Sequence, residues 1–348
     1  MQRPAGSPDA EIYGVLAPDV SHPSGQVDYV ALMTAEHTAP PSKFLLVAAF
    51  TALYVIWGST YLAIKIGTET IPPWPMIAAR HAIGGTVLYT ILRLSGTPAP
   101  QRAHWTGGVV GGVLLLVLGN GIIAYCAHRL ASGVSSMIVA TTPIWMVAAA
   151  SVRPGGRAPR PTEWLGLIVG LVGLAMLAGP SVMASIHGTA GALDIGAVGL
   201  VLIGTMSWSI GSVIGRELPK PQSAFMTSAL QMLSAGALLT VVCLVTGQWQ
   251  QVDLPTISVR SWLAFWYLIV FGSLLGFTAY VWLLRVAKTS QVATYAYVNP
   301  IVALLLGASI GHEVVTPDML IAAVVTLVGV VLVVMPPLKT ESKREAAS

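Results

Sequence analysis

The sequence has little charge for its length. Asp, Glu, Lys and Arg make up 9% of its 348 residues, whereas an ordinary soluble domain has about 25%. Hydrophobic residues make up 55%, and the mean hydropathy is +0.75. The alternating strands of about ten residues that a membrane β-barrel needs are not visible. The composition excludes a soluble globular protein and predicts an all-α integral membrane protein.

Several catalytic and cofactor motifs are also missing. The sequence has no GxxxxGKS/T phosphate loop, no GxSxG nucleophile turn and no HExxH metal motif. Its two cysteines, Cys126 and Cys243, lie in apolar stretches without metal-ligand spacing. We therefore expect no cofactor, no metal site and no enzymatic activity. Asp and Glu occur only near the ends of the apolar stretches, so a buried carboxylate proton relay is not expected either.

Apolar stretches long enough to cross a membrane fill most of the chain. A helix needs about 20 apolar residues to span about 30 Å of hydrocarbon. Ten stretches qualify, at residues 44–66, 75–94, 107–126, 133–152, 163–183, 193–215, 224–246, 262–284, 290–311 and 318–337. We therefore predict ten transmembrane helices.

The two ends of the chain differ from this apolar part. Residues 1–42 are rich in proline and polar residues and have no apolar run of signal-peptide length, so we expect a disordered cytoplasmic tail. Met33 opens a shorter leader, and the choice between Met1 and Met33 as the start stays open. Residues 338–348 are expected to form a second cytoplasmic tail.

The distribution of Lys and Arg predicts the orientation. With the N-terminus inside, almost all basic residues between the stretches become cytoplasmic, and only Arg129 and Arg260 lie outside. This bias predicts a multi-pass protein of the inner (plasma) membrane with both termini in the cytoplasm. It also explains the net charge of +4 without a nucleic-acid partner.

The chain repeats itself faintly with an offset of 151 to 157 residues. Leu171-Val172-Gly173 recurs as Leu327-Val328-Gly329, and Trp57 recurs as Trp208. A repeat of five helices is odd-numbered, so its second copy enters the membrane from the opposite side. We therefore predict two inverted five-helix repeats, at residues 43–184 and 190–337, as in many alternating-access carriers.

One proline recurs in the middle of an apolar stretch of each repeat. Pro143 lies in the fourth stretch and Pro300 in the ninth, and each proline removes a backbone donor and frees the carbonyl four residues earlier. Interrupted helices at matching places point to a transporter's binding site. We expect both prolines to act as hinges, although static kinks are an equal alternative.

Three segments carry a resemblance to a known family. They read LYVIWGSTYLAIKIG at 53–67, AARHAIGG at 78–85 and AYVWLLRVAKTSQVATYAYVNPIVALLLGASIGHE at 279–313. In order and spacing they resemble the EamA-type branch of the drug/metabolite transporter superfamily. The resemblance implies two EamA repeats and an inner-membrane carrier that exports amino acids, related metabolites or toxic compounds. One departure is Arg153, which stands near a place where many first repeats carry an acidic residue, as Glu313 ends the ninth stretch here.

Polar and aromatic residues near the midplane form the candidate substrate site. Single residues of this kind are more often packing residues, but their concentration around the two prolines favours a central aromatic cavity. The candidates are Trp57, Ser59, Tyr61, Arg80, Asn120, Thr142, Trp208, Tyr280, Tyr295 and Asn299. We expect an apolar or amphipathic small molecule to stack on the aromatic rings and to be oriented by Asn299.

Four further ionisable residues have a structural alternative. Lys65 either reaches the outer interface, where it would meet Glu69 one turn later, or binds an anionic group of the substrate. Arg80 either makes a structural contact or binds an anionic group of the substrate. His81 and His128 are expected to be structural.

Three classes of function fit these observations. A secondary transporter of small metabolites comes first, a channel or a lipid scramblase-like protein is the alternative, and a membrane enzyme is disfavoured because no catalytic constellation can be assembled. The partners are then the lipid bilayer and a small-molecule substrate. The sequence leaves the oligomeric state, the substrate's identity, the direction of transport and the coupling ion open.

Overall fold

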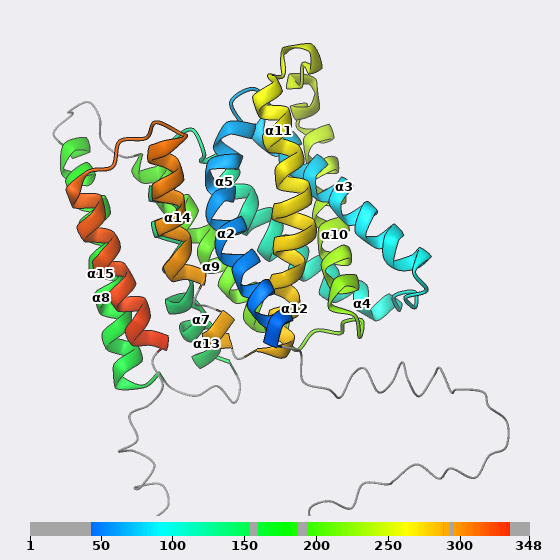
Figure 1. Cartoon of the computed structure of the whole chain (residues 1–348), viewed down its shortest axis with the longest axis horizontal. Helices are drawn as coiled ribbons and strands as arrows, with labels where there is room; N and C mark the ends of the chain where they lie inside the picture. The colour runs from blue at the N-terminus through cyan, green and yellow to red at the C-terminus, as the bar shows by residue number, and fades with distance from the viewer. Residues whose placement is uncertain (1–42, 154–158, 187–193, 288, 293–294, 335–348) are drawn as a thin grey trace, which may run out of the picture. The chain divides into compact units, whose positions relative to one another are not determined.

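The computed structural model describes residues 43–153, 159–186, 194–287, 289–292 and 295–334. Within these residues all secondary structure is helical and no strand occurs, which confirms the all-α prediction (Figure 1). The tails predicted at 1–42 and 338–348 lie outside the described residues.

The helices follow the predicted apolar stretches to within a few residues. The largest shift is in the third stretch, predicted to begin at residue 107, where the helix begins at Arg102. The elements are α2 Lys43–Gly67, α3 Pro73–Leu94, α4 Arg102–Gly111, η1 Gly112–Asn120, α5 Gly121–Tyr125, α6 Ser132–Val139, α7 Thr142–Ser151, α8 Pro161–Ile186, α9 Ile195–Ile214, α10 Ala224–Val245, η2 Gln248–Gln251, η3 Leu254–Thr256, α11 Val259–Tyr267, η4 Leu268–Phe277, α12 Thr278–Val286, α13 Thr289–Val292, α14 Tyr295–Ser309 and α15 Pro317–Val334.

Six helical segments of the described residues are long and apolar enough to cross a membrane. They are α2, α4 to α5, α6 to α7, α9, α10 and α11 to α12. Large apolar side chains on the outside of the bundle, such as Ile203 on α9, Val241 on α10 and Leu305 on α14, are exposed as lipid contact requires. The protein is therefore an integral membrane protein.

Two of these segments change from α-helical to π-helical hydrogen bonding in their middle. η1 continues α4 and leads into α5, and η4 connects α11 to α12 in the same way. Long π-helical segments are rare, and π-bulges frequently occur at functional sites. Both π segments contribute to the cavity described below.

The two prolines predicted to interrupt helices have different surroundings. The fourth stretch breaks at residues 140–141, and Pro143 lies in the first turn of α7, where a missing N–H costs nothing. The predicted interruption of the fourth stretch is therefore present, and Pro143 lies at the beginning of its second helix. The freed Val139 carbonyl accepts a hydrogen bond from Thr142 Oγ1 at 2.5 Å. Pro300, in contrast, lies inside α14, which continues through it.

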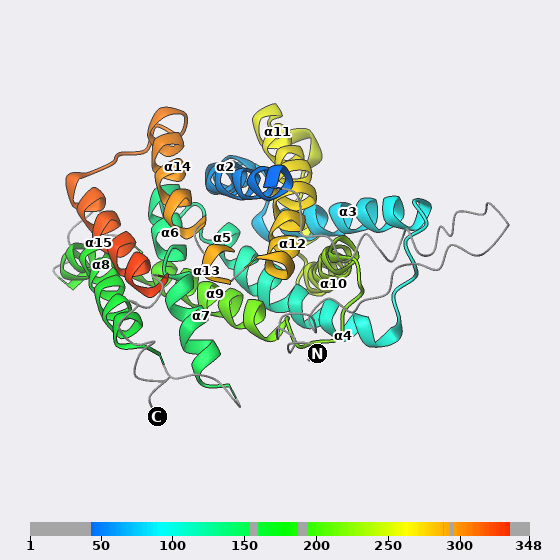
Figure 2. The same ribbon diagram turned by 60° about the horizontal axis from the view of Figure 1, so that its bottom comes forward.

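Glycines bring two pairs of helices into close contact. α3 packs on α10, where a Cβ added to Gly85 would lie 2.7 Å from Leu233 N and one added to Gly236 would meet Ala82 N. α8 packs on α15, where a Cβ added to Gly173 would lie 2.6 Å from Thr326 N. Figures 1 and 2 show α8 side by side with α15 and α3 against α10. Small residues allow this approach of helix backbones.

Candidate functional site

A cavity lies in the middle of the bundle, between α2, α3, η1, α9 and η4. Its volume is about 60 Å³, far below the ~300–1,000 Å³ of a pocket that holds a small molecule. The cavity must therefore widen to accept a metabolite. The candidate residues that line it are Trp57, Tyr61, Arg80, Asn120, Trp208 and Tyr295.

Arg80 is the cationic group of this central cavity. Its Nε donates to Ser273 Oγ in η4 at 2.8 Å, and one Nη donates to Asn120 Oδ1 in η1 at 3.1 Å. The residue is only 3% exposed. Among the described residues no carboxylate lies within ion-pair distance of it. A buried charge is costly without a counter-charge, so an anionic group of a ligand fits here.

His81 also lines the cavity, although sequence reasoning treated it as structural. It is 1% exposed, and neither ring nitrogen has a hydrogen-bond partner in the described part of the chain. Buried polar groups are normally paired, and an unpaired one needs an explanation. A ligand or a water in the cavity would supply that partner. The only feature of the sequence that pointed to His81 as a cavity residue was its position next to Arg80, at the end of AARH.

Four aromatic side chains form a cluster on one side of the cavity. Trp57 on α2 lies 5.4 Å from Trp208 on α9, 4.9 Å from Tyr280 on α12 and 5.3 Å from Tyr295 on α14 between ring centroids. Trp208 Nε1 donates to the Tyr280 hydroxyl at 3.1 Å. We call Trp57, Trp208, Tyr280 and Tyr295 the aromatic cluster. It offers ring faces and edges for an apolar or aromatic solute.

The remaining candidates do not line the cavity. Ser59 Oγ bonds the Tyr267 hydroxyl at 2.6 Å and so joins α2 to α11. Thr142 is occupied with the Val139 carbonyl. The Asn299 amide, oriented with its nitrogen toward the backbone, donates to Tyr295 O at 3.2 Å and Tyr54 O at 3.1 Å. These three residues hold helices together around the cavity.

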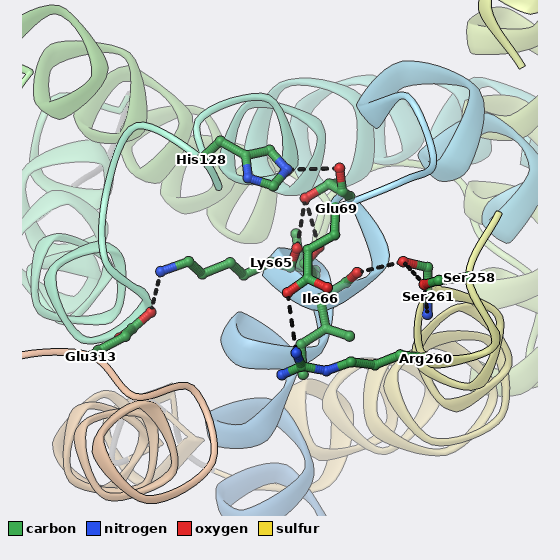
Figure 3. A network of polar contacts seen from close by, with 10 residues as sticks. Lys65, Ile66, Glu69, His128, Ser258, Arg260, Ser261 and Glu313 are labelled. Atoms are coloured by element: carbon green, nitrogen blue, oxygen red, sulfur yellow. Dashed lines mark hydrogen bonds and ion pairs between the residues drawn. The ribbon is translucent and has the colours of Figure 1, made fainter. Parts of the chain in front are cut away.

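An ion pair closes one end of the bundle. Lys65 Nζ lies 2.7 Å from Glu313 Oε1, with the two side chains 31% and 7% exposed. Glu313 also accepts hydrogen bonds from Ser132 N and, at 2.7 Å, from Ser132 Oγ at the start of α6. The expected contact of Lys65 with Glu69 is wrong, because Glu69 faces Arg260 at 3.6 Å instead (Figure 3). The carboxylate thus joins α2, α6 and the segment after α14.

The Glu313 carboxylate stays charged in this position. Burial acts to raise its pKa, but hydrogen bonds from Lys65 and Ser132, together with the Lys65 charge, outweigh burial and hold the pKa below its ordinary value. Gly307 leaves room for the carboxylate, since an added Cβ would lie 2.5 Å from Glu313 Oε2. Other links at this end join Ser261 Oγ to Ile66 O and His128 Nε2 to Thr68 O (Figure 3).

A second ion pair lies after the ends of α7 and α9. Arg153 pairs with Glu217, and their side chains are 25% and 65% exposed. Sequence reasoning left the pairing of the first repeat in doubt, because Arg153 stands where an acidic residue was expected. In the structure Arg153, which follows the fourth stretch, pairs with Glu217, which follows α9. In the Lys65–Glu313 pair the base is on α2 and the acid follows α14. If the fourth stretch corresponds to α14 and α9 to α2, the two pairs have the base and the acid in exchanged positions.

Known proteins resemble this chain over most of its length. The EamA-like transporter family matches residues 44–179 and again residues 195–335. The uncharacterized inner membrane transporter YedA of Escherichia coli is 36% identical over 291 residues, which cover 83% of this chain and 90% of YedA. A probable amino-acid metabolite efflux pump of Salmonella typhimurium is 23% identical, over 79% of this chain and 90% of the pump.

A solved structure supports the fold. One crystal structure of a protein aligns with a TM-score of 0.58 at 19% identity, over 83% of this chain and 96% of that one. The two family matches together cover most of the chain, and the match to YedA covers 83% of it. The chain belongs to the EamA-like transporter family.

Proposed function

We propose that this protein is a secondary transporter that exports small metabolites by alternating access. Its family consists of transporters, so it is not an enzyme. The observation that carries the proposal is the central cavity, in which the Arg80 cation has no carboxylate partner among the described residues. The bundle around it is joined by two ion pairs, Lys65–Glu313 and Arg153–Glu217. In this state a solute would be enclosed, and breaking one pair at a time would admit it from one side.

The mechanism rests on ten membrane spans in two inverted repeats, at 43–184 and 190–337. Two separate family matches support the repeat. The two glycines Gly85 and Gly236, which lie at the contact of α3 with α10, are 151 residues apart, and η1 and η4 begin 156 residues apart. A pseudo-twofold axis would place equivalent residues opposite one another in this way.

The topology follows from the same repeat. Both termini lie in the cytoplasm, which puts Lys65–Glu313 at the outer end and Arg153–Glu217 at the inner end. We call them the outer and the inner ion pair. The name of YedA supports an inner-membrane location. A fluorescent protein fused after Lys339 should glow, and alkaline phosphatase fused there should be inactive; the opposite pattern would contradict the inverted repeat.

The substrate is an amphipathic solute with an anionic group. Arg80 would pair with that group, and Trp57 and Trp208 of the aromatic cluster would contact the apolar part. The name of the Salmonella typhimurium relative supports amino acids or their derivatives.

Counterflow in proteoliposomes tests the function. A thermal-shift panel of amino acids, their N-acyl derivatives and cationic drugs selects the solute, and vesicles loaded with it unlabelled should then accumulate the labelled solute transiently. Arg80→Gln should abolish the accumulation, and Arg93→Gln, which changes an exposed arginine at the end of α3, should not. Efflux without saturation or counterflow would favour a channel or a lipid scramblase.

A further inference from the structure

A second and larger cavity lies near the ends of α9 and α12 and the beginning of α10. Its volume is about 360 Å³, within the size range of small-molecule pockets. Three basic residues, Arg216, Lys220 and Arg285, are part of its lining. In Figure 1 α12 ends toward the lower end of the bundle. We call this second cavity the inner basic cavity.

Among the described residues, all three cations of this cavity are bound only to neutral groups. Arg216 donates to the Leu284 carbonyl at 3.2 Å, and Lys220 donates to the Arg216 carbonyl. Arg285 donates to Pro221 O at 2.9 Å and to further acceptors in the loop before α10 and in the first turn of α10. Within the described ranges no carboxylate lies at ion-pair distance from any of the three. The cavity therefore has an uncompensated positive charge.

A neutral acceptor in the same wall also lacks a partner. Gln231 on α10 is 6% exposed and lines the cavity, and its Oε1 has no hydrogen-bond donor in the part of the chain that the structure describes. The side-chain amide of Gln231 packs closely against Gly111, since a Cβ added to Gly111 would meet Gln231 Nε2. An acceptor buried without a donor is destabilising, so a donor is expected to occupy this place.

We propose that the inner basic cavity binds an oxyanion of the phosphate type that has a hydroxyl beside it. The oxyanion would pair with Lys220 and Arg216, and the hydroxyl would donate to Gln231 Oε1. A phosphate ester of a soluble metabolite has this chemistry, and so does the headgroup of phosphatidylglycerol. Basic pockets between helices on the cytoplasmic side of membrane proteins bind anionic headgroups in this way.

The charges around Lys220 support an anion at this place. Burial lowers the pKa of Lys220, and the nearby positive charges of Arg285 and Arg216 lower it further. An oxyanion would remove this repulsion and restore the ordinary basicity of the amine.

The site is separate from the central cavity. Ser212 Oγ, which lines the inner basic cavity, bonds the Tyr280 hydroxyl at 2.7 Å, and Tyr280 in turn bonds Trp208 of the central cavity. The aromatic cluster thus lies between the two. The proposal does not depend on transport, because a binding measurement tests it directly.

The test uses purified full-length protein in nanodiscs of phosphatidylcholine, with and without phosphatidylglycerol. Inorganic phosphate is titrated at constant ionic strength with chloride as the balancing anion, and bound phosphatidylglycerol is counted by native mass spectrometry. Lys220→Gln should weaken the binding of phosphate or of the headgroup about fivefold, the effect of one charge near a membrane surface. Lys220→Arg should retain binding, and Lys43→Gln, an exposed lysine at the start of α2, is the matched control.

Each outcome identifies or excludes a source. Phosphate binding that Lys220→Gln weakens in phosphatidylcholine alone indicates a soluble phosphate ester. Retention of phosphatidylglycerol that the same variant loses indicates the lipid. Gln231→Leu should weaken whichever ligand binds. If Lys220→Gln and Lys43→Gln bind phosphate and phosphatidylglycerol as the wild type does, the proposal is wrong, whether or not the protein transports.

Discussion

Removing the charge of Glu313 should open the outer end of the bundle. Glu313→Gln retains the size of the side chain and loses the attraction to Lys65 Nζ at 2.7 Å. That attraction is about 1.5 kcal/mol at the dielectric constant of water and about 6 kcal/mol at an effective value of ~20. Since Lys65 is 31% exposed and burial of the carboxylate opposes the pairing, the net loss is expected near the lower figure, at about 2 kcal/mol. This corresponds to an approximately 30-fold shift toward the outward-open state.

Cysteine accessibility measures this shift. Cys126 and Cys243 are first replaced by alanine, and Thr60, which lines the central cavity, is replaced by cysteine. In right-side-out vesicles an impermeant maleimide should label this cysteine up to about 30-fold faster in Glu313→Gln than in the parent. Labelling from the inside should not become faster.

The exposed ion pair Arg129–Asp194 provides the control. Asp194 faces Arg129 at 3.7 Å, and both side chains are more than 40% exposed, so this pair contributes about 0–1 kcal/mol. Asp194→Asn also preserves the cap at the start of α9, where the side chain accepts from Ala197 N. It should leave the labelling rate unchanged. Equal rates in Glu313→Gln and the parent would refute the assignment of Lys65–Glu313 as the outer closure.

Four further results are expected. Arg80→Lys should retain insertion but lose most transport, because an amine cannot bridge Asn120 and Ser273 as the guanidinium does; transport at the wild-type rate would place the anion elsewhere. Trp208→Leu should raise the apparent KM about two- to tenfold through the loss of aromatic contacts, as counterflow kinetics would measure. Pro300→Ala should slow turnover more than it changes affinity, since it adds a hydrogen bond inside α14; an unchanged rate would make Pro300 a static kink. Because the pKa of Glu313 lies below its ordinary 4.5, the outer pair stabilises the closed state above that pH and weakens only as pH falls below it, so the ratio of the labelling rates in Glu313→Gln and the parent, in which thiol ionisation cancels, should be constant between about pH 5 and 8.

The helices were predictable because lipid imposes a strong rule. A chain in hydrocarbon must satisfy its backbone internally, so apolar length alone locates helices such as α2 and α10 within a few residues. The candidates Trp57, Arg80 and Trp208 were predictable for a related reason, since polar and aromatic groups are rare at that depth and gather where helices face one another.

The features of the site that the sequence did not predict depend on contacts between residues far apart in the chain. Lys65 had a plausible partner one turn away in Glu69, and only the packing of α14 on α2 brings Glu313 closer. His81 looks like any histidine in an apolar helix until its neighbours are known. Pro143 reads as a break near the middle of an apolar stretch, and only the structure shows that it lies in the first turn of a new helix, after Ala140 and Thr141, whose backbone angles stay in the αR region.

The two π-helical segments give the third and eighth stretches spare backbone. A π turn holds one residue more than an α turn, so it can move along a helix as successive carbonyls exchange one donor for the next. Each residue that such a bulge passes rotates by about 100° around the helix axis, the angle between neighbours in an α-helix. Passage through η1 would carry the Asn120 amide away from Arg80, and passage through η4 would do the same for Ser273. The Arg80 guanidinium would then lose its hydrogen bonds to Asn120 and Ser273, while the ends of the helices stay in place.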